Sequence, residues 1–193
     1  SLNGEERVGT AARLDRLPIF SFHRQVTALL AFIFFFELGD ISTFAFAAPA
    51  ILEQWHATID TVAIVTSLTF LGMFFGATCG GALADRIGRK KALIVATAWY
   101  SGFSLINALV ENVHELAAVR FLTGIGLSAM TSVAITYVAE IFPAKSRGRF
   151  QATVLMIGLL GIPAAAFVAR FAIPIADWGW RLVFVWGGLG IAF

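Results

Sequence analysis

Six apolar segments, separated by short polar connections, constrain the fold of this chain more than any other feature of its sequence. Most of them reach about 20 residues, the length that an α-helix needs to cross roughly 30 Å of hydrocarbon. Hydrophobic residues make up 59% of the chain and charged residues only 13%, unlike a typical soluble domain. The segments are 25–52, 61–84, 92–110, 116–142, 150–173 and 179 to the end. The sequence therefore predicts an all-α, multi-pass protein that lies in a lipid bilayer.

The two ends of the chain differ in character. Residues 1–24 are polar and predict an N-terminal tail, whereas residues 25–193 predict a transmembrane domain. The chain begins with Ser1 rather than Met, and its sixth apolar segment is too short to span a bilayer. We therefore expect the sequence to be part of a longer protein, with the sixth helix truncated.

Cations gather in alternate connections. Most Lys and Arg residues lie in the tail, in connection 86–91 and in connection 145–149. The intervening connections contain acidic residues and no cation. Because connections on the cytoplasmic side of a membrane are enriched in Lys and Arg, we expect the N-terminus in the cytoplasm and the protein in the cell membrane. A net charge of +2 does not indicate a nucleic-acid partner.

Two carboxyl groups lie in the middle of the first apolar segment. Glu37 and Asp40 are three residues apart and so share one helical face. A charged side chain at the bilayer centre costs about 2.5–3.5 kcal/mol, and intramembrane acids usually have a function. Burial favours the protonated form, which is the property that a proton carrier needs. We predict a functional role for Asp40 first and Glu37 second; the alternative is a structural role for both in a wet crevice.

The fourth apolar segment has a small and polar face. Every fourth residue from Arg120 to Glu140 is glycine, serine, threonine or a charged residue, and this spacing keeps them on one side of a helix. Such a face indicates a water-filled path or close helix packing. Arg120 and Asp40 differ in depth in the membrane by about 10 Å, a distance that allows pairing. The candidate residues of a substrate path are Ser128, Ser132, Thr136 and, in the fifth segment, Arg170.

Glycine spacing indicates where helices pack. In the second segment Gly72, Gly76 and Gly80 repeat every four residues. Small residues allow close helix contact in lipid, so this stripe predicts a tight helix interface.

Several motifs resemble those of a known family. The connection from Gly81 to Lys91 resembles the G-x-L-A-D-R-x-G-R-K signature of the major facilitator superfamily. Stretches 120–126 and 137–149 resemble the fourth-helix signature of its sugar porters and metabolite:proton symporters, and 178–181 resembles the opening of the family's sixth helix.

The resemblance implies a six-helix N-terminal bundle, built as a 3+3 inverted repeat, with a C-terminal six-helix half as its missing partner. It implies that Asp40 is the protonation site and Arg120 its partner. It also implies a cytoplasmic gate with an ion-pair network. The gate residues are Gly81, Asp85, Arg86, Gly88, Arg89, Lys90, Glu140 and Arg147.

We therefore expect a secondary transporter and not an enzyme. The expected function is proton-coupled uptake of a small metabolite such as an organic acid or a sugar, with the proton as coupling ion, no other cofactor and no metal site. The fifth segment has few hydrogen-bonding side chains before Arg170, which favours an organic acid. Stretch 158–163 loosely resembles a motif of proton-driven drug exporters, so an antiporter is an alternative. A uniporter is another.

Overall fold

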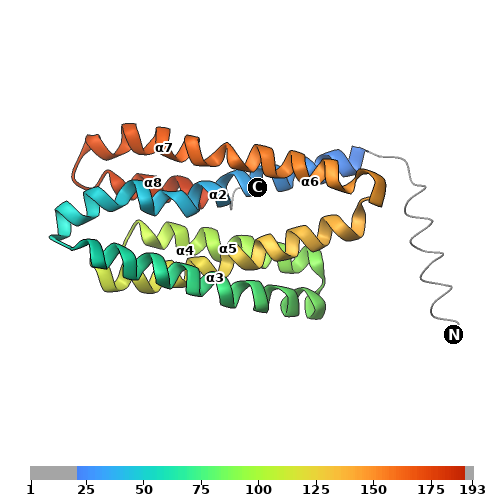
Figure 1. Cartoon of the computed structure of the whole chain (residues 1–193), viewed down its shortest axis with the longest axis horizontal. Helices are drawn as coiled ribbons and strands as arrows, with labels where there is room; N and C mark the ends of the chain where they lie inside the picture. Colours follow the sequence, from blue (N-terminus) through green and yellow to red (C-terminus); the bar gives the residue numbers. More distant parts are fainter. Residues whose placement is uncertain (1–20, 190–193) are drawn as a thin grey trace, which may run out of the picture.

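The computed structural model describes residues 21–189, without the side chain of residue 144. This part of the chain is almost entirely helical (Figure 1). The predicted all-α fold is therefore confirmed, and most of the predicted tail, residues 1–24, lies outside the described residues. The elements are α2 (Ser21–Trp55), α3 (Ile59–Ile87), α4 (Arg89–Asn107), α5 (Val113–Ile141), α6 (Ala144–Leu159), α7 (Gly161–Ala172), the 3-10 turn η1 (Ile173–Ile175) and α8 (Trp180–Gly188).

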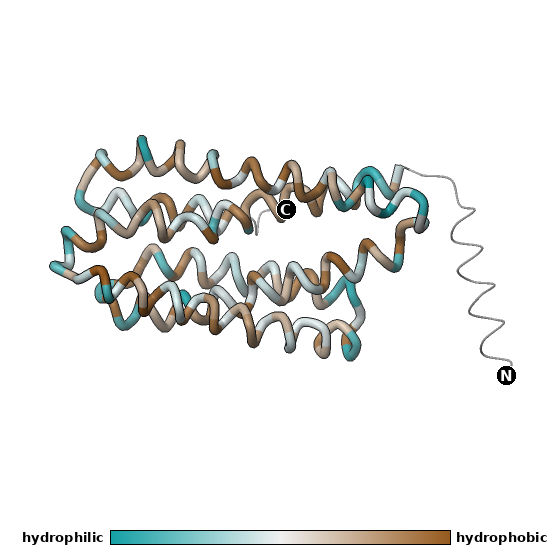
Figure 2. The backbone as a smooth tube through the Cα atoms, viewed as in Figure 1, coloured by the Kyte–Doolittle hydropathy of each residue, from teal (hydrophilic) through white to brown (hydrophobic). Residues whose placement is uncertain are grey.

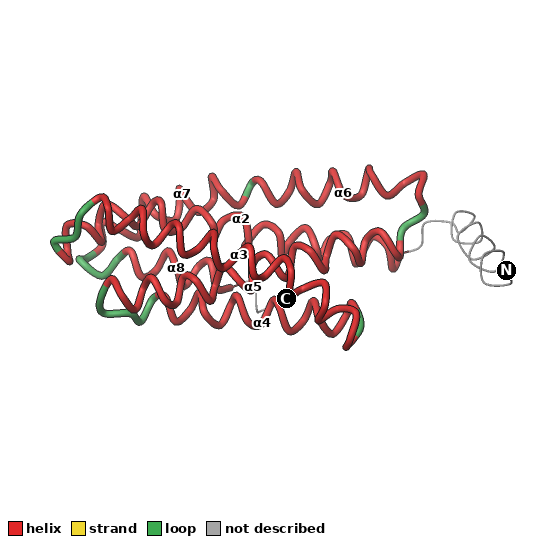
Figure 3. The backbone as a smooth tube through the Cα atoms, turned by 60° about the horizontal axis from the view of Figure 1, so that its bottom comes forward, coloured by secondary structure: helices red, strands yellow, loops and turns green. Residues whose placement is uncertain are grey.

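The fifth apolar segment forms two helices instead of one. Helices α6 and α7 meet at Leu160, where Figure 3 shows a short interruption. The physical cause is Pro163, which has no N–H group and whose ring displaces the carbonyl group of residue 159 four positions earlier. Gly161 then brings α7 against α2, because a Cβ atom there would overlap the carbonyl oxygen of Phe35.

Four helical stretches are long and apolar enough to cross a membrane: 21–55, 59–87, 113–141 and 145–175. Hydrophobic residues cover their length, and polar residues gather at the turns (Figure 2). Helix α4 has 19 residues and is less apolar, because it begins with three cations, residues 89–91, and contains the buried polar residues Ser101, Ser104 and Asn107. Helix α8 has nine residues. Together with the comparisons reported below, these stretches make the chain a multi-pass membrane protein.

The helices form two layers with the same internal pattern (Figure 1). In one layer α5 contacts α3 and α4, and in the other α2 contacts α6, α7 and α8. The first three spans, α2, α3 and α4, correspond to the last three, α5, α6 with α7, and α8. Exchanging corresponding spans converts the contacts of one layer into those of the other and leaves the contact of α4 with α8 unchanged. This is the contact pattern of a 3+3 repeat.

The glycine stripe of α3 lies against α5, so the predicted interface is confirmed. Gly72, Gly76 and Gly80 are buried. A Cβ atom at Gly72 would overlap the carbonyl oxygen of Phe121, and one at Gly80 would lie 2.7 Å from the Cα atom of Ala129. The backbones of the two helices therefore touch directly, as small residues allow in lipid.

Replacing Gly76 by alanine should destabilise the protein, whereas the same change at Gly102 should not. A Cβ atom at Gly76 would overlap the Ile125 carbonyl oxygen, so the helices must separate, at a cost of about 1–3 kcal/mol. A Cβ atom at Gly102 has nothing within 4 Å, and alanine there gains up to about 1 kcal/mol of helix propensity. Thermal unfolding of the detergent-purified full-length protein should give Tm changes of opposite sign. An unchanged Tm for Gly76→Ala would contradict the close contact.

Both basic connections lie at one end of the bundle, on the right in Figure 1. We call this the basic end; it comprises residues 86–91 and 145–149. The chain turns from α3 into α4 at Gly88 alone, with a φ of 86°, a conformation that favours glycine. The opposite, acidic end contains the connections near 53–60, 111–115 and 177.

Candidate functional site

A buried ion pair joins α2 to α5. The Arg120 Nη1 atom lies 3.2 Å from the Asp40 Oδ2 atom. The side chain of Asp40 is 0% exposed and that of Arg120 is 2% exposed. Asp40 lies in α2 of one layer and Arg120 in α5 of the other, so this ion pair links the two layers. The structure thus brings together two of the predicted coupling residues.

The other Asp40 oxygen atom accepts a hydrogen bond from α4 and lies close to the backbone of α8. The Ser104 hydroxyl group donates a hydrogen bond to Asp40 Oδ1. Gly187 of α8 lies directly beside the carboxylate, since a Cβ atom at this position would overlap Asp40 Oδ1. The carboxylate therefore has a charged partner on one side, a hydroxyl donor on the other, and no room for a larger residue than glycine over it.

Two aromatic rings enclose the Arg120 guanidinium group. Its Cζ atom lies 5.8 Å from the ring centres of both Phe44 and Phe184. A cation within about 6 Å of an aromatic ring centre is attracted by the ring's negative face. The Arg120 Nε atom is buried and has no hydrogen-bond partner among the described residues. The guanidinium group therefore keeps a free donor next to Asp40.

The second predicted acid, Glu37, lies one turn away in a separate environment. It is 2% exposed, and the Thr131 hydroxyl group of α5 donates a hydrogen bond to its Oε1 atom. Its Oε2 atom is buried and has no partner among the described residues. A neutral carboxyl group costs less to bury than a carboxylate. Glu37 is therefore a second buried acid, and among the described residues it makes no hydrogen bond with Arg120.

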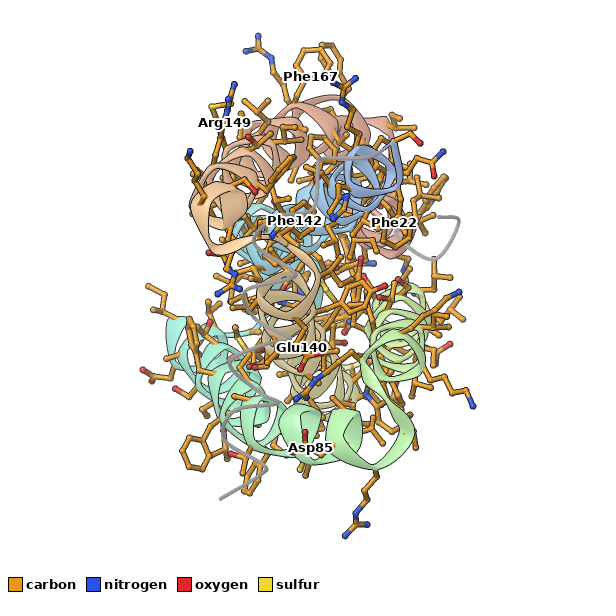
Figure 4. All side chains as sticks on the ribbon, turned by 90° about the vertical axis from the view of Figure 1, so that its right-hand side faces the viewer. Phe22, Asp85, Glu140, Phe142, Arg149 and Phe167 are labelled. Carbon is orange, nitrogen blue, oxygen red and sulfur yellow. The ribbon has the colours of Figure 1, made fainter. Side chains whose placement is uncertain are left out.

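The basic end holds an exposed ion pair that joins three helices. The Arg89 Nε atom donates to Glu140 Oε1 at 2.9 Å, and its Nη2 atom lies 3.0 Å from Asp85 Oδ1. Asp85 is in α3, Arg89 begins α4 and Glu140 is near the end of α5. The hydrogen bond to Glu140 raises the pKa of Arg89 above its ordinary value, and the charge of Asp85 adds to this. Figure 4 shows Asp85 and Glu140 at this end.

The structure separates Arg147 from this ion pair, unlike the network expected from the sequence. Its Nη2 atom donates instead to the carbonyl oxygen of Phe142 at 3.2 Å. Phe142 follows the last residue of α5 and precedes Pro143, so its carbonyl group has no partner within a helix. Arg147 fills that need. The other gate candidates are exposed or open to solvent: Gly81, Arg86, Gly88 and Lys90.

The predicted substrate-path residues lie apart from the buried pair. Ser128, Ser132 and Thr136 are half-buried on α5, and Thr136 donates to the carbonyl oxygen of Ser132. Arg170 is exposed on α7. Among the described hydrogen bonds, none joins these four residues to the buried acids.

Sequence reasoning missed the two hydroxyl donors, Ser104 and Thr131. Both are polar residues inside apolar segments. Such residues can indicate a functional contact, but they are common. Thr69 gives the same signal and bonds only to a carbonyl group of its own helix. Only the packing of α4 and α5 against α2 distinguishes the donors.

Comparisons with known proteins agree with this architecture. A sequence profile described as Major Facilitator Superfamily matches residues 30–193. The structure of the proton:xylose symporter XylE superimposes with a TM-score of 0.79 at 18% identity, over 89% of this chain and 43% of that one. At this identity the likeness concerns the fold alone.

Relatives in sequence are transporters. The "Putative metabolite transport protein YyaJ" of Bacillus subtilis is 47% identical over 95% of this chain and 41% of its own length. The niacin transporter NiaP of Acinetobacter baylyi is 35% identical over 92% of this chain and 40% of its own length. The 4-hydroxybenzoate transporter PcaK of Pseudomonas aeruginosa is 33% identical, with 98% and 42% covered.

This chain spans about two fifths of the length of the curated relatives it matches. The profile match nevertheless covers most of the chain itself, and the relatives are metabolite and aromatic acid transporters rather than enzymes. The chain belongs to the Major Facilitator Superfamily of transporters.

Proposed function

We propose that the full-length protein takes up a small aromatic carboxylate together with protons. Two of the relatives are named for niacin and 4-hydroxybenzoate, each of which joins an aromatic ring to a carboxylate. The shared chemistry of these two substrates supports the same class here. It also agrees with the sparse hydrogen-bonding groups of the fifth segment, which offers little to a sugar.

The observation that carries the proposal is the buried pair of Asp40 and Arg120. A charged pair in a membrane interior is costly to bury, which is why such residues usually have a function. When Asp40 takes up a proton, its attraction for Arg120 weakens, and the guanidinium group becomes available to an anionic substrate. Proton binding and substrate binding would then favour each other. This linkage is what a symporter needs.

The membrane orientation follows from the charges. The basic end would lie in the cytoplasm, because positively charged connections remain on that side of the cell membrane. The ion pairs of Arg89 with Asp85 and Glu140 would then close the cytoplasmic end, and would break when the protein opens inward. The acidic end would face outside.

The experiment uses proteoliposomes that contain the full-length protein and an internal pH dye. External nicotinate or 4-hydroxybenzoate should acidify the lumen faster than in protein-free liposomes, and an inward proton gradient should drive accumulation. Nicotinamide, which lacks the carboxylate, is the control and should give no signal. Lumen alkalinisation would indicate an antiporter, and transport that does not depend on the proton gradient would indicate a uniporter. Either result would overturn the proposal.

A further inference from the structure

The Ser104 hydroxyl group lies between a buried carboxylate and a backbone carbonyl group. It donates to Asp40 Oδ1, and its Oγ atom is also 3.2 Å from the carbonyl oxygen of Phe184. A hydroxyl group has one hydrogen atom, so it can fully donate to only one of these two acceptors at a time. All three groups are buried, which excludes bulk water as a substitute partner.

A similar arrangement occurs at the second acid, although Thr131 is only half-buried. The Thr131 hydroxyl group donates to Glu37 Oε1, and its Oγ1 atom lies 3.0 Å from the carbonyl oxygen of Leu127. Thr131 therefore also has a choice between a carboxylate and a carbonyl group. Each of the two buried acids of α2 is paired with one such hydroxyl group, contributed by α4 in one case and α5 in the other.

We propose that Ser104 and Thr131 are positioning residues for proton binding, each of which turns its hydrogen atom from carboxylate to carbonyl when the acid is protonated. With the acid ionised, the hydroxyl group donates to it. When a proton delivered by hydronium, which leaves as water, binds the carboxylate oxygen, the new O–H group donates to the hydroxyl oxygen. The hydroxyl hydrogen then points to the carbonyl group. No covalent bond other than the acid's O–H bond forms, and loss of the proton reverses the sequence.

This rotation keeps the hydrogen bonds around the acid satisfied in both protonation states. A buried donor or acceptor that loses its partner destabilises the protein, and a protonated acid would otherwise face a hydroxyl group that still points at it. With the carbonyl group as second acceptor, each donor has an acceptor in both protonation states. The hydrogen bonds of Asp40 and Glu37 can therefore adjust to a bound proton without a shift of the helices.

The two sites differ in what the rotation connects. Phe184 belongs to α8, so protonation of Asp40 would strengthen a hydrogen bond between α4 and α8. Those helices are in close contact nearby, where a Cβ atom at Gly188 would lie 2.7 Å from Leu105. Leu127 belongs to the same helix as Thr131, so the rotation at Glu37 stays within α5. Only at the Asp40 site does the rotation reach a third helix, α8.

Few other charges face these acids. The titratable groups around Asp40 are Arg120 of α5, Glu37 of α2 and Tyr100 of α4. The described part of α8 contributes only Arg181, which donates to the carbonyl oxygen of Ala108, and α7 contributes only the exposed Arg170. The hydroxyl donors are therefore the main groups, besides Arg120, that respond to proton binding.

The inference rests on the proposed function, but infrared spectroscopy tests it without transport. The difference spectrum of the full-length protein between high and low pH contains the carbonyl stretch of protonated carboxyl groups, and Asp40→Asn identifies the Asp40 band. Ser104→Ala should shift that band to higher frequency, because the acid loses its acceptor. It should also move the titration midpoint upward by about 0.5–1 pH unit, because the ionised form loses the stronger hydrogen bond.

Matched variants separate this effect from a general change in packing. Ser104→Thr keeps the hydroxyl group and should keep the band in place. Ser101 is a buried serine on the same helix whose hydroxyl group bonds to neither acid among the described residues, so Ser101→Ala should not shift the band. Thr131→Val should shift the Glu37 band, with Thr69→Val as its control. An Asp40 band at the same frequency and midpoint in Ser104→Ala would overturn the inference. A shifted band in a protein that lacks proton-coupled transport would instead leave the inference in place and refute the proposed function.

Discussion

The Asp40→Asn variant of the full-length protein will exchange substrate across a proteoliposome membrane but will not accumulate it. Asparagine has nearly the same shape and can still accept a hydrogen bond from Arg120, but it cannot carry a proton. Uphill accumulation driven by a proton gradient should therefore fall to the equilibrium level. Counterflow of radiolabelled substrate, which needs no net proton movement, should continue. The measurement is uptake of the same substrate in both assays.

Asp60→Asn is the matched control for this variant. Asp60 lies in the first turn of α3 at the acidic end and is exposed, so it has no part in the buried pair. Its replacement should leave both assays unchanged. Full accumulation by Asp40→Asn would remove Asp40 from proton coupling. Loss of both activities, in a protein with a normal Tm, would show that Asp40 acts in substrate binding instead.

The Arg120→Leu variant should be strongly destabilised, and more so at high pH than at low pH. Removing one partner of a buried ion pair leaves the other charge uncompensated, at a cost of about 3–5 kcal/mol. That corresponds to a fall in Tm of roughly 10 °C for a domain of about 200 residues and to a smaller fall for the longer full-length protein. Below the pH at which the unpaired Asp40 takes up a proton, the uncompensated charge disappears, and part of the loss should be recovered. Thermal unfolding of the purified protein from pH 5 to pH 8 measures this.

The double variant Arg120→Leu, Asp40→Asn tests whether the two residues form one energetic unit. With neither charge present, stability should exceed that of Arg120→Leu at pH 8, and its pH dependence should be reduced. Accumulation should still be absent. A double variant no more stable than Arg120→Leu would contradict the coupling between Asp40 and Arg120 that their 3.2 Å contact indicates.

The sequence allowed the contact of Asp40 with Arg120, and the family resemblance implied it. Charged residues in the middle of apolar segments are few and must find partners, so the number of possible pairs is small. The stripe of Gly72, Gly76 and Gly80 was informative for a similar reason, because small residues repeated along one helix face allow close contact with a neighbouring helix. In both cases the chemistry left few alternatives.

Details that depend on local geometry could not be anticipated. Arg147 resembled a member of the ion-pair network, yet the end of α5 at Pro143 leaves the Phe142 carbonyl oxygen free for it. The interruption at Leu160 lies three residues before the proline that causes it. The donors Ser104 and Thr131 are recognisable only once α4 and α5 are placed against α2, since hydroxyl groups in helices usually bond to their own backbone.

The turn at Gly88 restricts how α3 and α4 can move. One residue joins the two helices, and the ion pair of Asp85 with Arg89 spans the same joint from the side. A linker this short cannot stretch, so when the C-terminal end of α3 moves, the start of α4 must move with it. Any opening of the bundle at the basic end would therefore have to rotate α3 and α4 together about Gly88. This rotation would break the salt bridge between Arg89 and Glu140.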